Sequence, residues 1–191
     1  MTTETTGRRE RKKAATRQAL ADAALRLFLE RGYDQVSIKD IADAADVSTT
    51  TLFKHFSGKE ALVYDEDEGQ EAALIAAVLE RPAGQSIPAA LRDYVLRSWI
   101  ETSQDPRFAP FNRLTRDTPA LQEYGDRMWM RHVNALARAI AEESADVDAD
   151  TCAALAHFTL ETVRLARSRP DPRRATERAF DLLEHGWPGA G

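Results

Sequence analysis

Residues 37–59, SIKDIADAADVSTTTLFKHFSGK, predict two short helices joined by a tight turn. Ser37 is suited to cap the first helix, whose apolar residues recur with helical spacing on one face: Ile38, Ile41, Ala42 and Ala45. Ser48 is suited to cap a second helix of about eight residues, which would span roughly 12 Å. This length is close to the width of a DNA major groove, roughly 12 Å. The stretch therefore predicts a helix-turn-helix.

The residues around this stretch complete a small helical head. Residues 16–31 predict a helix with an apolar face, and Gly32 suits its C-terminal turn. Asp46 falls in the turn, where aspartate tolerates a left-handed backbone better than most residues. We expect the three helices to share one core, made of Leu27, Phe28, Ile38, Ile41, Leu52 and Phe56.

The rest of the chain predicts further helices and no strands. Caps and apolar stripes place them at about 57–81, 86–104, 108–114, 119–144, 150–168 and 171–186. The sequence thus indicates an all-α fold of about nine helices. We expect a flexible basic arm at 1–14, a helix-turn-helix DNA-binding domain at 15–62, and a ligand-binding and dimerisation domain at 63–191.

Charge and composition limit the partners and the compartment. Residues 1–60 carry 11 Lys or Arg against 9 Asp or Glu, whereas the remainder is acidic and the whole chain has a net charge of −5. Charge suited to nucleic acid therefore lies in the head. The single cysteine, Cys152, allows no intrachain disulfide, and no apolar run is long enough for a membrane span. We expect a cytoplasmic protein without a membrane partner.

The side chains that perform catalysis or bind metals form no recognisable constellation. The four histidines, the cysteine and the scattered carboxylates match no nucleophile elbow, phosphate-binding glycine loop or His/Cys ligand pair. The acidic run 65–68 is best explained as a solvated helix face, because consecutive carboxylates point in different directions. The sequence predicts no catalytic residues, no metal and no cofactor.

The last two helices suit self-association. Two copies of such a helix pair form a four-helix bundle about a two-fold axis in many homodimers, although the pair could instead pack wholly inside one subunit. The apolar stripe that we assign to the dimer interface consists of Leu155, Thr159, Thr162, Val163, Ala166, Phe180 and Leu183.

Aromatic residues gather in the helices of the second domain, where a mostly apolar ligand pocket is expected, although core packing explains each one singly. We assign to this effector pocket Tyr94, Trp99, Phe108, Phe111, Tyr124, Met128, Trp129, His132 and Phe158.

The run ALRLFLERGYDQVSIKDIADAADVSTTTLFKHFSGKEAL resembles the DNA-binding head of the tetracycline-repressor (TetR) family of bacterial regulators. The likeness covers about residues 16–62 and includes the F-x-x-x-G-Y join, the I-A-x-A-A-x-V-S core and the closing L-F-x-H-F-x-x-K-E-x-L. The resemblance implies a homodimer that binds an inverted-repeat operator in double-stranded DNA, usually as a repressor, and that a small ligand releases. Similar regulators, together with Arg107, Arg113 and Arg116, suggest an anionic, lipophilic effector.

Transferred by position, the family's base-reading residues are Lys39, Thr49, Thr50 and Phe53. Lysine donates to guanine, threonine hydroxyls bond either base type, and an aromatic edge meets a thymine methyl. The phosphate-contact positions are Ser37, Ser48, Thr51, Lys54, His55 and Lys59.

Three residues depart from the family pattern, namely Asp46, Phe53 and Gly58, and Phe53 lacks the phenolic hydroxyl that is commonest at its position. Two other functions stay open from the sequence. One is an all-helical enzyme or small-molecule carrier, and the other is a DNA-binding activator without ligand release.

Overall fold

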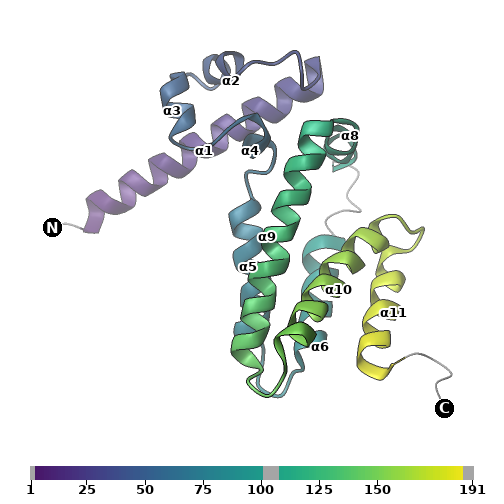
Figure 1. The fold of residues 1–191 in the computed structure, drawn as a ribbon. Coiled ribbons are helices and arrows are strands. Elements are labelled where there is room, and N and C mark those ends of the chain that lie inside the picture. The colour runs from purple at the N-terminus through teal and green to yellow at the C-terminus, as the bar shows by residue number, and fades with distance from the viewer. Residues whose placement is uncertain (1–2, 101–107, 187–191) are drawn as a thin grey trace. The chain divides into compact units, whose positions relative to one another are not determined.

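The computed structural model describes residues 3–100 and 108–186, and within them it contains ten α-helices, one π-helix and no strand (Figure 1). The all-α prediction is confirmed. The chain forms two compact units, a head unit of Met1–Asp65 with Ala109–Gly125 and a body unit of Glu66–Phe108 with Asp126–Gly191. The head unit thus includes residues 109–125, which we had assigned to the second domain.

The head unit is built from α1 (Thr3–Arg31), α2 (Ile38–Ala44), α3 (Thr49–Phe53), α4 (Lys59–Val63), α8 (Ala109–Asp117) and the start of α9 (Pro119–Glu143). All six core residues predicted from the sequence lie in or against its apolar cluster, which also contains Leu121 of α9. Phe111 and Leu114 of α8 pack against the same cluster, and this packing places α8 in the head unit.

The helix-turn-helix has the caps and the turn that the sequence predicts. The Ser37 Oγ accepts a hydrogen bond from the Asp40 amide at 3.1 Å, and the Ser48 Oγ accepts one from the Thr51 amide at 3.1 Å. Asp46 has a φ of 53°, so an aspartate occupies the left-handed position of the turn. The second helix, α3, has five residues and is shorter than the predicted eight.

Residues 3–14 of the N-terminal arm are helical, whereas the sequence predicted a flexible segment. Helix α1 begins at Thr3 and continues to Arg31 without a break. Thr16 does not cap a helix start, because its Oγ1 donates to the carbonyl of Lys12 at 3.0 Å inside the helix. The Arg, Lys, Glu and Ala residues of the arm have high helix propensity, and they extend the helix that follows them.

The helix predicted for residues 57–81 is divided into α4 and α5 (Asp67–Leu79), with turn residues between them. The start of α4 has no side-chain cap, and Glu60 Oε1 instead accepts a hydrogen bond from the Tyr33 hydroxyl at 2.7 Å. Gly58, which has no side chain to cap with, is instead the residue before α4.

The body unit contains α5, α6 (Ile87–Tyr94), the π-helix η1 (Val95–Ile100), the remainder of α9, α10 (Ala149–Arg167) and α11 (Pro172–His185). Helices α10 and α11 lie side by side (Figure 1) and share one buried core with α6 and η1. A π-helical turn is rare and is often found at functional sites. Among the described residues, no helix combines the length and the apolar composition needed to cross a bilayer.

Within the head unit, Tyr64 occupies a space that Gly125 of α9 leaves free. The Tyr64 hydroxyl donates to the Leu121 carbonyl at 3.0 Å, and a Cβ at position 125 would lie 2.9 Å from that hydroxyl oxygen. The Tyr64 ring stacks on Tyr124, with centroids 5.5 Å apart, so the ring has little freedom to retreat.

We therefore expect Gly125→Ala to destabilise the protein by about 1 kcal/mol, because the tyrosine loses its hydrogen bond. In a Tyr64→Phe background the same substitution should instead stabilise the protein by up to about 1 kcal/mol, through alanine's higher helix propensity. Chemical denaturation of the four proteins of this double-mutant cycle measures the effect. Equal effects of Gly125→Ala in both backgrounds would contradict the contact.

Candidate nucleic-acid interface

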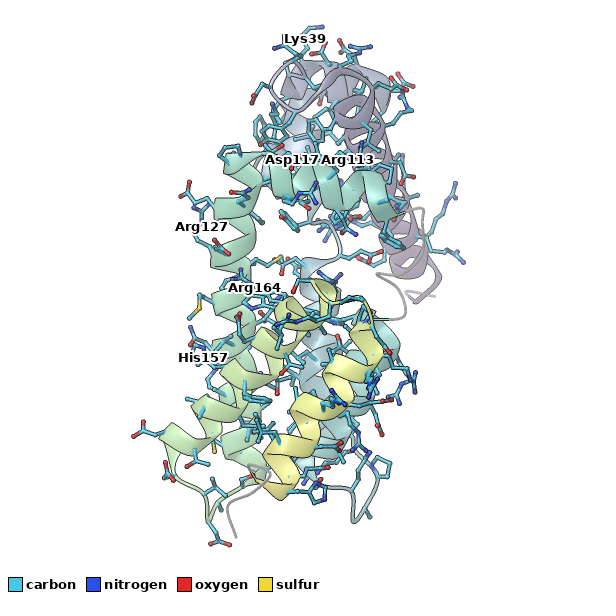
Figure 2. All side chains as sticks on the ribbon, turned by 90° about the vertical axis from the view of Figure 1, so that its right-hand side faces the viewer. Lys39, Arg113, Asp117, Arg127, His157 and Arg164 are labelled. Carbon is cyan, nitrogen blue, oxygen red and sulfur yellow. The ribbon has the colours of Figure 1, made fainter. Side chains whose placement is uncertain are left out.

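The four residues predicted to read bases are exposed on the helix-turn-helix. Lys39 lies in the first turn of α2, while Thr49, Thr50 and Phe53 lie in α3. Figure 2 shows Lys39 pointing away from the helices of the head unit, and its side chain is 76% exposed. Phe53 is 57% exposed, an unusual position for a large apolar ring unless it has a partner. These side chains together offer a cation, two hydroxyls and an apolar ring to a base edge.

Lys39 forms an exposed ion pair within the head unit. Its Nζ lies 2.5 Å from Oδ2 of Asp43, one turn further along α2. This hydrogen bond is the main cause that raises the pKa of Lys39, so the ammonium group stays charged at neutral pH. Exposed pairs of this kind contribute little to stability, and Lys39 can leave Asp43 for a base at small cost.

Three of the predicted phosphate-contact residues hold the helix starts. The Ser37 Oγ donates to the Asp40 carboxylate at 2.5 Å while it caps α2, and the Ser48 and Thr51 hydroxyl oxygens are 2.9 Å apart at the start of α3. Ser37 and Ser48 are exposed and Thr51 is half-buried. Their hydroxyls therefore already stabilise the helix starts. A phosphate group of DNA would be an additional partner of the same hydroxyls.

Lys54 and His55 lie within a positively charged part of the head. Burial of the His55 imidazole lowers its pKa, and the positive charges of Lys13, Arg17 and Lys54 lower it further. Nδ1 of His55 is buried and has no hydrogen-bond partner among the described residues. Lys54 and Lys13 are exposed, so the end of α3 and the middle of α1 together offer cations to a phosphate backbone.

Lys59, the last predicted phosphate contact, is used inside the head. Its Nζ donates to the Tyr33 carbonyl at 2.7 Å and lies 4.1 Å from the centroid of the Tyr33 ring. Burial of the Tyr33 ring, followed by its hydrogen bond to Glu60, raises the pKa of that hydroxyl well above its ordinary value. Lys59 thus ties the start of α4 to the loop before α2.

Arg17 is a residue of the head that the sequence reasoning missed, whereas Lys13 belongs to the basic arm that it predicted. The guanidinium of Arg17 donates to the carbonyls of His55 and Asp65, both at 2.8 Å, and lies 4.3 Å from the centroid of the Phe56 ring. Lys13 lies one turn earlier on α1. The signal was present in the helix-forming residues of the arm, because a helix that starts before Thr16 places these two side chains on one face.

The structure distributes the predicted effector residues over both units. Phe111 and Tyr124 belong to the head unit, where their rings pack against Tyr64 with centroids 6.4 and 5.5 Å away. Phe108 is exposed. The other six lie in the body unit, namely Tyr94, Trp99, Met128, Trp129, His132 and Phe158.

Aromatic rings in the body unit form a connected group. The Trp99 and Trp129 centroids are 5.0 Å apart, and the Trp99 Nε1 donates to the Tyr94 hydroxyl at 3.2 Å. Two arginines of α10 cover these rings, with Arg164 5.2 Å from the Trp129 centroid and Arg167 5.7 Å from that of Trp99. Arg164 also pairs with Asp126.

The arginines that suggested an anionic effector lie elsewhere. Arg113 and Arg116 are in α8 of the head unit (Figure 2), Arg116 pairs with Asp117 at 3.0 Å, and Arg107 lies outside the described residues. A cavity of about 230 Å³ in the body unit is lined by none of the predicted effector residues, but by Ala76, Ala77, Glu80, Arg81, Pro82, Gln85, Ala90, Asp93 and Arg97.

The predicted dimer residues are mostly core residues of one chain, which corrects that assignment. Five side chains are at most 4% exposed, namely Thr159, Thr162, Val163, Ala166 and Phe180. Leu155 and Leu183 pack against the same core. A buried side chain offers no surface to a second subunit, so the five buried residues match the alternative in which the helix pair packs inside one subunit.

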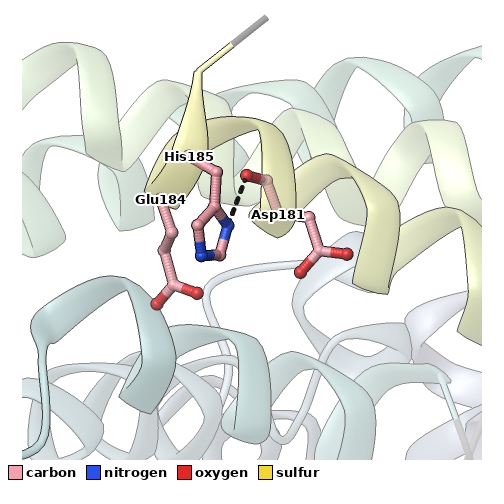
Figure 3. Close-up of side chains that lie close together, drawn as sticks. All are labelled: Asp181, Glu184 and His185. Carbon is pink, nitrogen blue, oxygen red and sulfur yellow. Dashed lines mark hydrogen bonds between the residues drawn. The ribbon is translucent and has the colours of Figure 1, made fainter. Parts of the chain in front are cut away.

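Asp181, Glu184 and His185 lie close together in the last turn of α11 (Figure 3). Two of their groups already have partners, because His185 Nδ1 is 3.1 Å from the Asp181 carbonyl oxygen, and Glu184 accepts from Arg92 at 3.3 Å and from Ser86 at 3.2 Å. Asp181 and His185 are exposed. These contacts describe a polar helix end, and they do not indicate a metal site.

Comparison with known proteins gives sequence relatives that extend beyond the head and solved structures that share the fold. The profile of bacterial regulatory proteins of the tetR family matches residues 20–64. The HTH-type transcriptional regulator TcmR of Streptomyces glaucescens is 34% identical over 152 residues, which cover 75% of this chain and 67% of TcmR. This similarity extends well beyond the head.

Two solved structures have the same fold at low sequence identity. SmeT, the repressor of a Stenotrophomonas maltophilia multidrug efflux pump, is 21% identical in its triclosan complex, with a TM-score of 0.60 over 92% of this chain and 93% of SmeT. The regulator FadR of Bacillus subtilis in complex with stearoyl-CoA is 18% identical, with a TM-score of 0.54 over 89% of this chain and 98% of FadR.

Proposed function

The chain belongs to the TetR family of bacterial regulatory proteins, a family of DNA-binding transcriptional regulators and not of enzymes, and from this premise we propose its specific role. The protein is a homodimeric repressor that acts in the cytoplasm, binds an inverted-repeat operator, and is released by a small, mostly apolar effector.

The exposed face of the helix-turn-helix is the observation that carries this proposal. Lys39 of α2 and both Thr50 and Phe53 of α3 are exposed. Thr49, the other threonine at the start of α3 that is predicted to read bases, is also exposed. The exposed cations Lys13 and Lys54 flank them. Phosphate contacts from such cations fix the register, while the side chains on the helix faces read the base edges.

A dimer follows from the form of the operator. Two recognition helices that enter successive major grooves lie roughly 34 to 36 Å apart, which requires two copies of the chain. The surface that remains for a partner on α10 is its exposed stripe, which includes His157, Glu161 and Leu165. Exposed Arg174 and Arg178 of α11 offer charges complementary to Glu161, so the two helices suit an isologous contact.

An apolar effector is supported by the aromatic group of the body unit. Trp99, Trp129 and Tyr94 form a packed group of aromatic rings, the residue type that is enriched in small-molecule sites. Two solved structures with this fold are complexes with small molecules that have apolar parts, namely SmeT with triclosan and FadR with stearoyl-CoA, whose acyl chain is apolar.

Mobility shifts with the DNA that flanks the chain's own gene test the proposal. We expect salt-sensitive binding to an inverted repeat, and a loss of about 10-fold to 100-fold in discrimination for Lys39→Ala and for Thr50→Ala. Lys54→Ala should instead weaken binding to all sequences alike and reduce the salt dependence by about one counterion.

Arg138→Ala is the matched control, because Arg138 is an exposed cation of the body unit. It should leave both affinity and preference unchanged. If Lys39→Ala and Thr50→Ala retained the full sequence preference, the assignment of the reading face would be wrong.

A further inference from the structure

His132 of α9 is a fully buried histidine with one nitrogen that lacks a partner. Its exposed fraction is 0%, and its Nε2 lies 2.7 Å from Oδ1 of Asp67, the first residue of α5. Nδ1 is also buried, and no hydrogen-bond partner for it exists among the described residues. Buried polar atoms are nearly always paired, so an unpaired one in the interior requires an explanation.

Asp67 determines which nitrogen carries the proton. A carboxylate only accepts hydrogen bonds, so Nε2 is the protonated nitrogen of the ring. Glu71 Oε2 lies 3.9 Å from the same nitrogen and favours the same tautomer. The guanidinium of Arg131 pairs with Asp67 and offsets the charge of that carboxylate. Nδ1 then presents a lone pair, which is a hydrogen-bond acceptor.

Residues close to His132 along α9, and close to its partner Asp67 along α5, contact the aromatic group of the body unit. Trp129, which is in contact with Trp99, lies one turn before His132 on α9. The turn of α5 that carries Asp67 and Glu71 also carries Gln70, whose carbonyl accepts from the Tyr94 hydroxyl at 3.2 Å. That hydroxyl in turn accepts from Trp99. His132, whose Nδ1 is an unpaired acceptor, thus lies on α9 one turn from a member of the aromatic group.

We propose that Nδ1 of His132 is the polar contact of the effector, and that the effector is an apolar molecule carrying a hydroxyl or N–H donor. This inference rests on the proposed function, because it assigns the chemistry of the molecule that releases the repressor. A hydrogen-bond donor fits the lone pair of Nδ1. A carboxylate or phosphate would be repelled by that lone pair and by the negative charges of Asp67 and Glu71 on the other side of the ring. The effector contact at this point is therefore neutral and not anionic.

A matched pair of probes tests the inference on the full-length protein. 2-Naphthol and 2-methoxynaphthalene share one ring system and differ only in the O–H donor. Calorimetry should show that 2-naphthol binds about 10-fold more tightly, as expected for one buried hydrogen bond. In His132→Gln, whose amide can still donate to Asp67, the ratio should fall to about 1 while the affinity for the ether stays the same.

A spectroscopic measurement avoids dependence on the variant. The ¹⁵N shift of the His132 Nδ1 should be that of an unprotonated nitrogen in the free protein, and it should move when 2-naphthol is added. An Nδ1 that is protonated, or that does not respond to the probe, would overturn the inference. Equal binding of the two probes, tighter binding of 2-naphthoate, or no binding of 2-naphthol up to about 1 mM would also overturn it.

Operator binding separates the two levels of the proposal. If the protein binds an inverted repeat and the ether releases it as well as the naphthol does, the donor inference fails while the repressor function stands. If the protein binds no inverted repeat, the proposed function fails independently of His132.

Discussion

Arg17→Ala is expected to destabilise the head unit by about 3 kcal/mol and to abolish operator binding. The substitution removes two hydrogen bonds from a charged donor, to the carbonyls of His55 and Asp65, and the contact with the Phe56 ring. Charged hydrogen bonds contribute about 1.5–3 kcal/mol each and a cation–π contact about 0.5–2 kcal/mol, and these contributions are not fully additive.

The loss of DNA binding follows from where the two carbonyls lie. His55 follows the recognition helix α3, and Asp65 follows α4. Arg17 of α1 donates hydrogen bonds to the backbone that follows each of these two helices. Its removal therefore releases the recognition helix from α1, which orients it. Displacement by about 1 Å is enough to lose the geometry of base contacts, which depend on fixed donor and acceptor positions.

Thermal unfolding followed by circular dichroism, together with mobility shifts, measures this effect. Arg26→Ala is the control on the same helix, because Arg26 is exposed and its pair with Glu30 has a distance of 3.7 Å. That variant should change the stability by less than about 0.5 kcal/mol. Arg17→Lys should fall between, since lysine keeps the charge but cannot reach two carbonyls at once. A stable Arg17→Ala protein that still binds DNA would show that the two hydrogen bonds of Arg17 are dispensable.

The helix-turn-helix was predictable because its determinants are local. Ser37 and Ser48 cap helices from within three residues, and the core positions follow the helical period. Asp46 adopts the left-handed backbone of the turn because the short polar side chain of aspartate tolerates this conformation. The role of Arg17 was not predictable in this way, because its two acceptors are 38 and 48 residues away in the sequence.

The break between α4 and α5 also depends on a contact between residues that are distant in the sequence. Residues 57–81 have a continuous helical pattern, yet the Tyr64 hydroxyl bonds to Leu121, 57 residues further along the chain. The same long-range packing brings α8 into the head unit, and it separates Phe111 and Tyr124 from the other predicted effector residues. Neither contact has a local sequence signal.

The apolar stripe of α10 and α11 shows a different limit. Leu155, Thr159 and Val163 recur with helical spacing on α10, and the period identifies a buried face. It does not identify what covers that face, because the core of a chain and an interface between chains bury the same residue types. Burial in the folded chain decides the matter, since Val163 and Phe180 are both 0% exposed.

Phe180→Ala should therefore act as a core substitution and cost about 3–5 kcal/mol of unfolding free energy, the usual range for a buried phenylalanine. The ring packs in the body core with residues of α6, α9 and α10, so its removal leaves a cavity inside one chain. Leu165 of α10 is the matched surface position, with 44% exposure. Leu165→Ala should change the stability of the chain by less than about 1 kcal/mol.

Substitutions of Leu165 and Phe180 should have the opposite ranking of effects when the oligomeric state is measured. The change at Leu165 should then have the larger effect. Leu165→Glu places a charge in the proposed dimer stripe beside Glu161, so we expect the dimer to dissociate in analytical ultracentrifugation while the helical content is retained. Phe180→Ala should lower the unfolding midpoint at every protein concentration, because its effect is on the chain and not on association. If Phe180→Ala were a stable monomer, its ring would have to act across the interface, and the core assignment of α11 would be wrong.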